Sequence, residues 1–140
     1  MHAVSERTLS AHVLALLKDR VRGFEALEIL LKLHGDRREW SANEIADTVS
    51  LDRYFARDEL DGLVEGGLLS ARGTGRERRW RFATESAELD APAAALVEAC
   101  RTSRLEVMHC MTENALERIR ESAVNAFADA FKLTKGRGDG

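Results

Sequence analysis

The chain has 140 residues, of which 44% are hydrophobic and 32% are charged, enough for one folded domain with a helical extension. A net charge of −3 excludes a polycation that attracts nucleic acid along its whole length, so any such contact needs a local basic patch. Abundant Ala, Leu, Glu and Arg, with Pro92 as the only proline, favour helix.

Two helices are predicted at the start of the chain. Apolar residues at helical spacing predict a first helix over about residues 8–18, namely Leu9, Val13, Leu16 and Leu17. Gly23 is a candidate N-cap for the second helix, whose apolar series is Phe24, Leu27, Leu30 and Leu31. Gly35 is expected to end this helix in the left-handed conformation.

Two shorter helices follow. Ser41 and Glu44 have the spacing of a capping box, which predicts the start of a short helix. Ser50 or Asp52 is expected to cap the next helix, whose inward residues are Ala56, Leu60, Leu63 and Val64. Gly66 and Gly67 are expected to end it.

A basic β-hairpin is predicted over residues 68–83. Apolar residues alternate at the period of a strand on both sides of a Gly-Thr-Gly turn at residues 73–75: Leu69 and Ala71, then Trp80 and Phe82. Five arginines against the single acid Glu77 give the hairpin a local charge of +4: Arg72, Arg76, Arg78, Arg79 and Arg81.

The rest of the chain is predicted to be helical as far as about residue 133. Asp90 is a candidate N-cap, with Pro92 in the first turn, where its missing N–H costs little. One helix or two remain open, because Asn114 can cap a fresh start. The expected organisation is a domain over residues 1–88, a helical dimerisation region over 89–133, and a disordered tail over 134–140.

The first half of the chain resembles the winged helix-turn-helix domains of bacterial transcription regulators, the MarR-like and related groups. The resemblance covers about residues 21–84 and rests on the Ser41-x-x-Glu44-Ile-Ala opening, the Gly67-Leu-Leu69 close and the basic hairpin, in that order. It implies a mainly α fold: a winged helix-turn-helix with a two-stranded β-wing and a C-terminal helical extension.

The C-terminal part is similar to the end of small uncharacterised bacterial proteins that have a winged-helix half. The similarity rests on Ala115-Leu-Glu-Arg-Ile-Arg-Glu-Ser122 and on Phe127-Ala-Asp-Ala-Phe131. It implies fold and bacterial origin more firmly than function, because one fold serves many functions.

The regulator resemblance implies binding to duplex DNA, and the charge pattern says which part is suited to it. Residues 41–66 hold two basic residues against seven acidic ones, a local charge of −5 that departs from the family's pattern. The hairpin carries +4, so we expect a contact to the phosphate backbone led by the wing. The candidate DNA-binding residues are Arg53, Tyr54, Arg57, Arg72, Arg76, Arg78, Arg79 and Arg81.

An alternative function remains open beside DNA binding. The acidic helix over residues 52–66 fits a protein-interaction module that binds a partner protein and not DNA, with the wing arginines paired inside the molecule or preventing aggregation. In either case a homodimer is expected through the C-terminal region, because winged-helix regulators commonly pair through helices outside the wing domain. The candidate interface residues are Leu96, Cys100, Val107, Met111, Leu116, Ile119, Phe127 and Phe131.

Other chemistry is sparse. Cys100 and Cys110 lack the short spacing of a zinc site, so we expect reduced thiols, no metal, no cofactor and no catalytic residue. No nucleophile or nucleotide motif occurs, so an enzyme is not expected. The longest apolar runs, at residues 13–17 and 91–97, are too short to span a bilayer, and the N-terminus lacks the pattern of a signal peptide. A cytoplasmic protein without a membrane partner is therefore expected.

Overall fold

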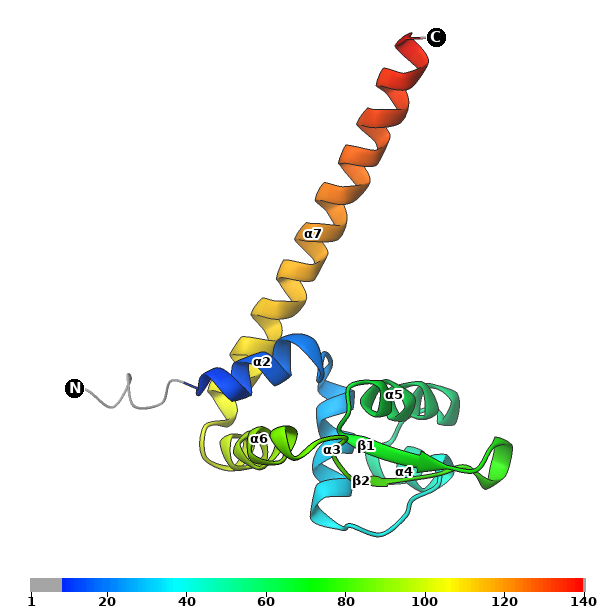
Figure 1. Ribbon diagram of the computed structural model, residues 1–140, viewed down its shortest axis with the longest axis vertical. Coiled ribbons are helices and arrows are strands. Elements are labelled where there is room, and N and C mark those ends of the chain that lie inside the picture. Colours follow the sequence, from blue (N-terminus) through cyan, green and yellow to red (C-terminus); the bar gives the residue numbers. More distant parts are fainter. Residues whose placement is uncertain (1–8, 140) are drawn as a thin grey trace, which may run out of the picture.

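A winged helix-turn-helix body carries one long helix that projects away from it (Figure 1). The computed structural model describes residues 9–139, and the side chains of residues 9–132. The helices are α2 (Ala11–Asp19), α3 (Phe24–Gly35), α4 (Ala42–Val49), α5 (Arg53–Glu65), α6 (Asp90–Thr102) and α7 (Arg104–Asp139), and the strands are β1 (Leu69–Arg72) and β2 (Arg79–Phe82). This mainly α architecture with a two-stranded wing confirms the predicted fold class.

The predicted caps explain where α4 and α5 begin. The Ser41 hydroxyl accepts from the Glu44 amide while the Glu44 carboxylate accepts from the Ser41 amide, so the capping box is confirmed. The Asp52 carboxylate accepts from the amides of Tyr54 and Phe55 and caps α5. Ser50 has a different role: with φ 56 it is the left-handed residue that ends α4.

The wing follows α5 through two glycines. Gly66 is the C-cap of α5 and Gly67 has φ +79, a conformation that glycine adopts without strain. Strands β1 and β2 pair antiparallel with Ala71 opposite Trp80. The expected alternation is confirmed at Trp80, which is 1% exposed and faces the helices.

One contact of the sheet was not predicted. Trp40 forms an isolated antiparallel bridge to Trp80, through backbone hydrogen bonds of 2.7 and 2.9 Å. The segment that leads from α3 to α4 therefore lies against β2 and gives the wing a third, very short pairing partner.

Three boundaries differ from the sequence expectation. Gly35 is the last residue of α3, and its backbone is not in the left-handed conformation. The helix ends instead at Asp36, whose backbone is extended. Asp90 is the first residue of α6, with Leu89 as its N-cap. The C-terminal region contains two helices, but the break lies at Ser103 and not at Asn114. Breaking there lets α7 turn and lay Val107 against the core, where it is fully buried.

Helix α7 leaves the body after its first turns. Val107 and Met111 are buried, whereas the larger apolar side chains further along are exposed. The helical backbone continues through Asp139, in the segment where the sequence predicts a disordered tail. Two residues of the predictions lie outside the described residues: Gly140, and Thr8, the predicted first residue of the N-terminal helix. Within residues 9–139, every helix is either too short or too polar to cross a membrane.

Candidate nucleic-acid interface

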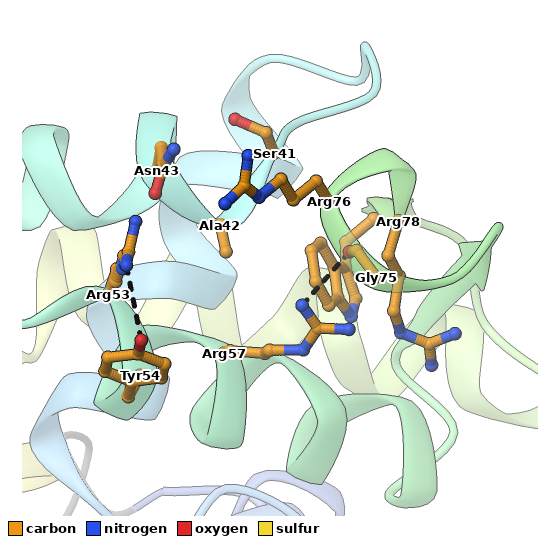
Figure 2. A pocket seen from close by; sticks show the side chains of 10 residues that line it. Ser41, Ala42, Asn43, Arg53, Tyr54, Arg57, Gly75, Arg76 and Arg78 are labelled. Atoms are coloured by element: carbon orange, nitrogen blue, oxygen red, sulfur yellow. Dashed lines mark hydrogen bonds between the residues drawn. The ribbon is translucent and has the colours of Figure 1, made fainter.

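A groove of about 440 Å³ lies between the start of α4, the first turns of α5 and the tip of the wing (Figure 2). Four arginines reach it, two from α5 and two from the wing. No carboxylate is among the residues that line it: Ser41, Ala42, Asn43, Arg53, Tyr54, Arg57, Gly75, Arg76, Arg78 and Trp80. Arginines that converge on a hollow without acids make a local site for an anion.

Helix α5 supplies one wall of the groove. Arg53 and Arg57 are four residues apart and therefore lie on the same side of the helix. Arg53 Nη2 donates to the Tyr54 hydroxyl at 3.2 Å, and Tyr54 is 66% exposed (Figure 2). Arg57 Nη1 donates to the Gly75 carbonyl at 3.1 Å and so ties α5 to the wing tip.

The wing tip is held in shape by its own arginines. Arg78 Nη1 donates to the Gly73 carbonyl at 3.1 Å. Arg79 Nη1 donates to the carbonyls of Arg76 and Arg78 at 2.9 and 3.0 Å. Gly73 has φ +82, and a Cβ there would come within 2.9 Å of the Glu77 carbonyl oxygen, so the turn requires glycine. Bonds to neutral carbonyls fix the loop without cancelling charge, although the guanidinium group of Arg78 also forms an ion pair with Asp61, at 3.2 Å.

Asp61 connects α5 to the wing from below the groove. Its Oδ1 accepts from Arg78 Nε at 3.2 Å and from Trp80 Nε1 at 3.0 Å. The Arg57 and Arg78 guanidinium carbons lie 5.7 and 5.4 Å from the centre of the Trp80 ring, within the range of cation–π attraction. Two of the four groove arginines therefore rest on one buried indole that a single carboxylate orients.

The other acids of α5 do not reach the groove. Asp52 is occupied as the N-cap. Glu59 and Glu65 line a separate hollow of about 390 Å³ beside the segment between α2 and α3, together with Arg20 and Arg22. Burial raises the pKa of Glu59, and the neighbouring carboxylates of Glu25 and Asp58 raise it further. The acids behind the local charge of −5 are thus distributed over α4 and different sides of α5.

The outward face of the wing differs from the groove. We call Arg72, Arg79, Arg81 and the nearby Glu39 the outer face. Arg72 Nη2 donates to Glu39 Oε1 at 2.7 Å, in a two-pronged pair with the carboxylate. The pKa of Glu39 is lowered, first by this hydrogen bond and further by the charges of Arg72, Arg81 and Arg79.

The structure brings together five of the eight predicted DNA-binding residues. Arg53, Tyr54, Arg57, Arg76 and Arg78 line the groove, and the three others lie on the outer face. Among the described residues, the side chains of Arg76 and Arg81 have no hydrogen-bond or ion-pair partner. Sequence reasoning missed Asn43, and it placed Asp61 on an acidic face for a partner protein and not beside Arg78 and Trp80. The capping box at Ser41 could have indicated Asn43, because it places this residue in the first turn of α4.

The predicted interface residues divide into two groups. Leu96, Cys100, Val107 and Met111 are at most 7% exposed and pack in the core of the single chain. Leu116, Ile119, Phe127 and Phe131 lie on α7 and are 40–74% exposed. Only the second group is uncovered for a partner.

The chain matches no protein-family model and no curated protein. Among solved structures it is similar to reduced HlyU from Vibrio cholerae, with 22% identity, a TM-score of 0.49, and coverage of 72% of this chain and 96% of that chain. It is also similar to a homodimeric winged helix-turn-helix DNA-binding domain from Mycobacterium bovis, a possible ArsR-family regulator, with 23% identity, a TM-score of 0.46, and coverage of 74% and 83%. A third similar structure is the adhesin competence repressor AdcR from Streptococcus pyogenes, with 16% identity, a TM-score of 0.46, and coverage of 85% of this chain and 89% of that chain. Identities this low concern the fold alone, so the groove itself has to support a function.

Proposed function

We propose that this protein is a winged-helix transcriptional regulator that binds duplex DNA as a homodimer. The observation that carries the proposal is the groove, in which four arginines from α5 and the wing converge. Among the described residues, only Arg78 of these four forms an ion pair, with Asp61. Guanidinium groups frequently bind phosphate oxygens through two parallel hydrogen bonds. The wing gives the phosphate contact, and α5 lies where a recognition helix enters the major groove.

Each side chain of the groove has a distinct part in this proposal. Arg76, which is unpartnered at the wing tip, binds a backbone phosphate. Arg53 and Tyr54, exposed at the start of α5, face base edges or the next phosphate. Arg57 and Arg78 also hold the wing tip in place, through the Gly75 and Gly73 carbonyls. Arg79 and Arg81 on the outer face add long-range attraction, whereas the charge of Arg72 is offset by Glu39.

The homodimer forms through the exposed apolar residues of α7. Leu116, Ile119, Phe127 and Phe131 lie beyond the point where α7 leaves the core. Covering such residues removes apolar surface from water, which is favourable by about 25 cal/mol per Å² of buried area. A two-fold dimer presents two wings, and its operator is expected to have matching two-fold symmetry.

The test is binding of labelled genomic duplexes, followed by fluorescence anisotropy across a salt series. Arg53→Ala with Arg76→Ala is the informative variant, because neither arginine holds another element of the fold in place. We expect weaker binding to all sequences and a salt slope that is shallower by about 0.9 for each phosphate that the variant no longer binds. Arg101→Ala, which removes an exposed arginine paired with Glu98 on α6, is the matched control and should bind normally.

A wild-type protein that binds no duplex at about 50 mM salt would refute the regulator proposal. The protein-interaction alternative receives less support from the geometry. Asp58, Asp61 and Glu65 lie on one side of α5, but Asp61 is occupied by Arg78 and Trp80, so this acidic side is not fully free for a partner. Co-purification of a partner that charge reversal at Asp58 abolishes, without DNA binding, would favour this alternative.

A further inference from the structure

Three exposed apolar residues of α7 recur at equal intervals. Leu105, Leu116 and Phe127 are each eleven residues apart and are 81%, 40% and 74% exposed. Eleven residues make three turns at about 3.67 residues per turn, so the three side chains lie on nearly one line along the helix. This line starts at the body and runs out along the projecting part of α7 (Figure 1).

The line begins at an apolar hollow. A cavity of about 430 Å³ lies where α2 meets the first turns of α7, and it is lined by Leu9, Leu14, Leu105, Glu106, His109 and Cys110. Leu14, on α2, is 41% exposed there. At the other end of the line, Phe131 follows Phe127 by one turn and is 62% exposed. One helix therefore has aromatic side chains towards its end and an apolar hollow at its base.

We propose that two copies pair their α7 helices antiparallel, so that the aromatic end of each docks at the base of the other. Equal spacing on both sides of Leu116 sets the register: Leu116 faces Leu116 of the second copy, and Phe127 faces Leu105. Phe127 then lies at the mouth of the hollow that Leu105 and Leu14 line, and Phe131 covers the surface one turn further on, beside the start of α7. The proposal rests on the homodimer proposed above and specifies its direction and its contacts.

The antiparallel direction follows from what each arrangement covers. In a parallel pair, the phenylalanines would meet only each other and both hollows would stay open. In the antiparallel pair, the exposed aromatic end of each α7 is buried against the apolar hollow of the other copy. A two-fold axis then passes close to Leu116. Such an interface is isologous and closed, which is the usual form of a homodimer.

The charges beside Leu116 favour the same direction. Glu113 lies three residues before Leu116 and Arg120 four residues after it, and both are exposed. Antiparallel pairing brings Glu113 of each copy next to Arg120 of the other. Parallel pairing would place like charges at the same level, which is unfavourable. Arg120 pairs at 3.3 Å with Glu117 in the single chain, an exposed contact that is easily rearranged.

Disulfide trapping in the full-length protein tests the direction directly. Leu105→Cys and Phe127→Cys are prepared as two separate proteins, mixed, and treated with a mild oxidant. Both positions are mostly exposed, so the substitutions leave the core intact. Both proteins also carry Cys110→Ser, because the native Cys110 thiol lines the same hollow as Leu105. We expect a disulfide between position 105 of one copy and position 127 of the other, identified by mass spectrometry, and no disulfide when either protein is oxidised alone. Asn125→Cys mixed with Leu105→Cys is the matched control and should not crosslink, because Asn125 lies on the opposite side of α7 from Phe127.

The outcomes separate this inference from the regulator proposal. A dimer by light scattering that traps 105 with 105, or 127 with 127, overturns the antiparallel pairing and leaves the homodimer and DNA binding in place. A monomer at the crosslinking concentration overturns both the pairing and the homodimer. DNA binding by the groove is measured independently through the Arg53 and Arg76 variants.

Discussion

The groove and the outer face of the wing both carry arginines, yet they arrange them differently. In the groove, guanidinium groups come from two elements and converge on a hollow, with Arg57 and Arg78 anchored to the carbonyls of Gly75 and Gly73. On the outer face, the arginines stand along one hairpin around Glu39, which pairs with Arg72. The groove has four arginines and the outer face has three arginines with Glu39, so the two differ both in convergence and in how far a carboxylate offsets the charge.

Trp80 supports both the groove and the wing hairpin. Of the predictions below, its replacement should have the largest effect, which is on the free energy of unfolding. Its ring is 1% exposed and contacts Arg57 and Arg78, while its backbone pairs with both Ala71 and Trp40. Replacing a buried tryptophan by alanine costs about 3–5 kcal/mol. Trp80→Ala should lower the free energy of unfolding by that amount in urea denaturation. A decrease below about 1 kcal/mol would show that the wing does not depend on this ring.

Asp61 gives a sharper test, because charge and position predict opposite results. Removing an acid close to the groove should favour DNA by simple electrostatics. We expect Asp61→Ala instead to weaken duplex binding by about tenfold, since the carboxylate holds Arg78 and Trp80 and charge-assisted hydrogen bonds contribute about 1.5–3 kcal/mol. The measurement is anisotropy at fixed salt.

Asp58→Ala is the control for this experiment. Asp58 is an exposed acid on the same helix and has no bond to the wing. Its removal should leave duplex binding unchanged or slightly stronger. If both variants bind DNA more tightly than the wild type, the orienting role of Asp61 is wrong and only its charge matters.

Local signals predicted much of the fold. The capping box at Ser41, the Asp52 cap and the alternation around Trp80 act within a few residues, so the sequence reveals them directly. The Trp40 bridge depends on a pairing with a residue far along the sequence, and no alternating pattern surrounds it. Ser103 differs little from Thr102 in helix propensity, so local sequence does not single out this break, after which Val107 is buried in the core.

The site was predicted less fully for a related reason. Counting charge along residues 41–66 gave −5. A helix, however, distributes neighbouring residues around its axis. Arg53 and Arg57 therefore line the groove, while Glu59 and Glu65 line another hollow. Asp61 was counted among the acids that oppose DNA binding. Its role depends on meeting Arg78 and Trp80 in space, which no local pattern encodes.

The smallest expected effect concerns the pH dependence of the outer face. The pKa of Glu39 lies below its ordinary value of 4.5 in the folded protein, mainly because Arg72 donates to its carboxylate. A depressed pKa means that this contact stabilises the fold above the pKa of the unfolded chain, and that the contribution disappears as pH falls through the lower folded-state pKa. Glu39→Gln should therefore be slightly less stable at neutral pH and should lose less stability on acidification, measured by urea denaturation at several pH values. Because the Arg72 side chain is exposed and that of Glu39 is 33% exposed, solvent screening keeps the effect small. If the variant and the wild type lose the same stability on acidification, the Arg72–Glu39 pair makes no measurable contribution to stability. The outer face would then be a solvated surface, unlike the groove.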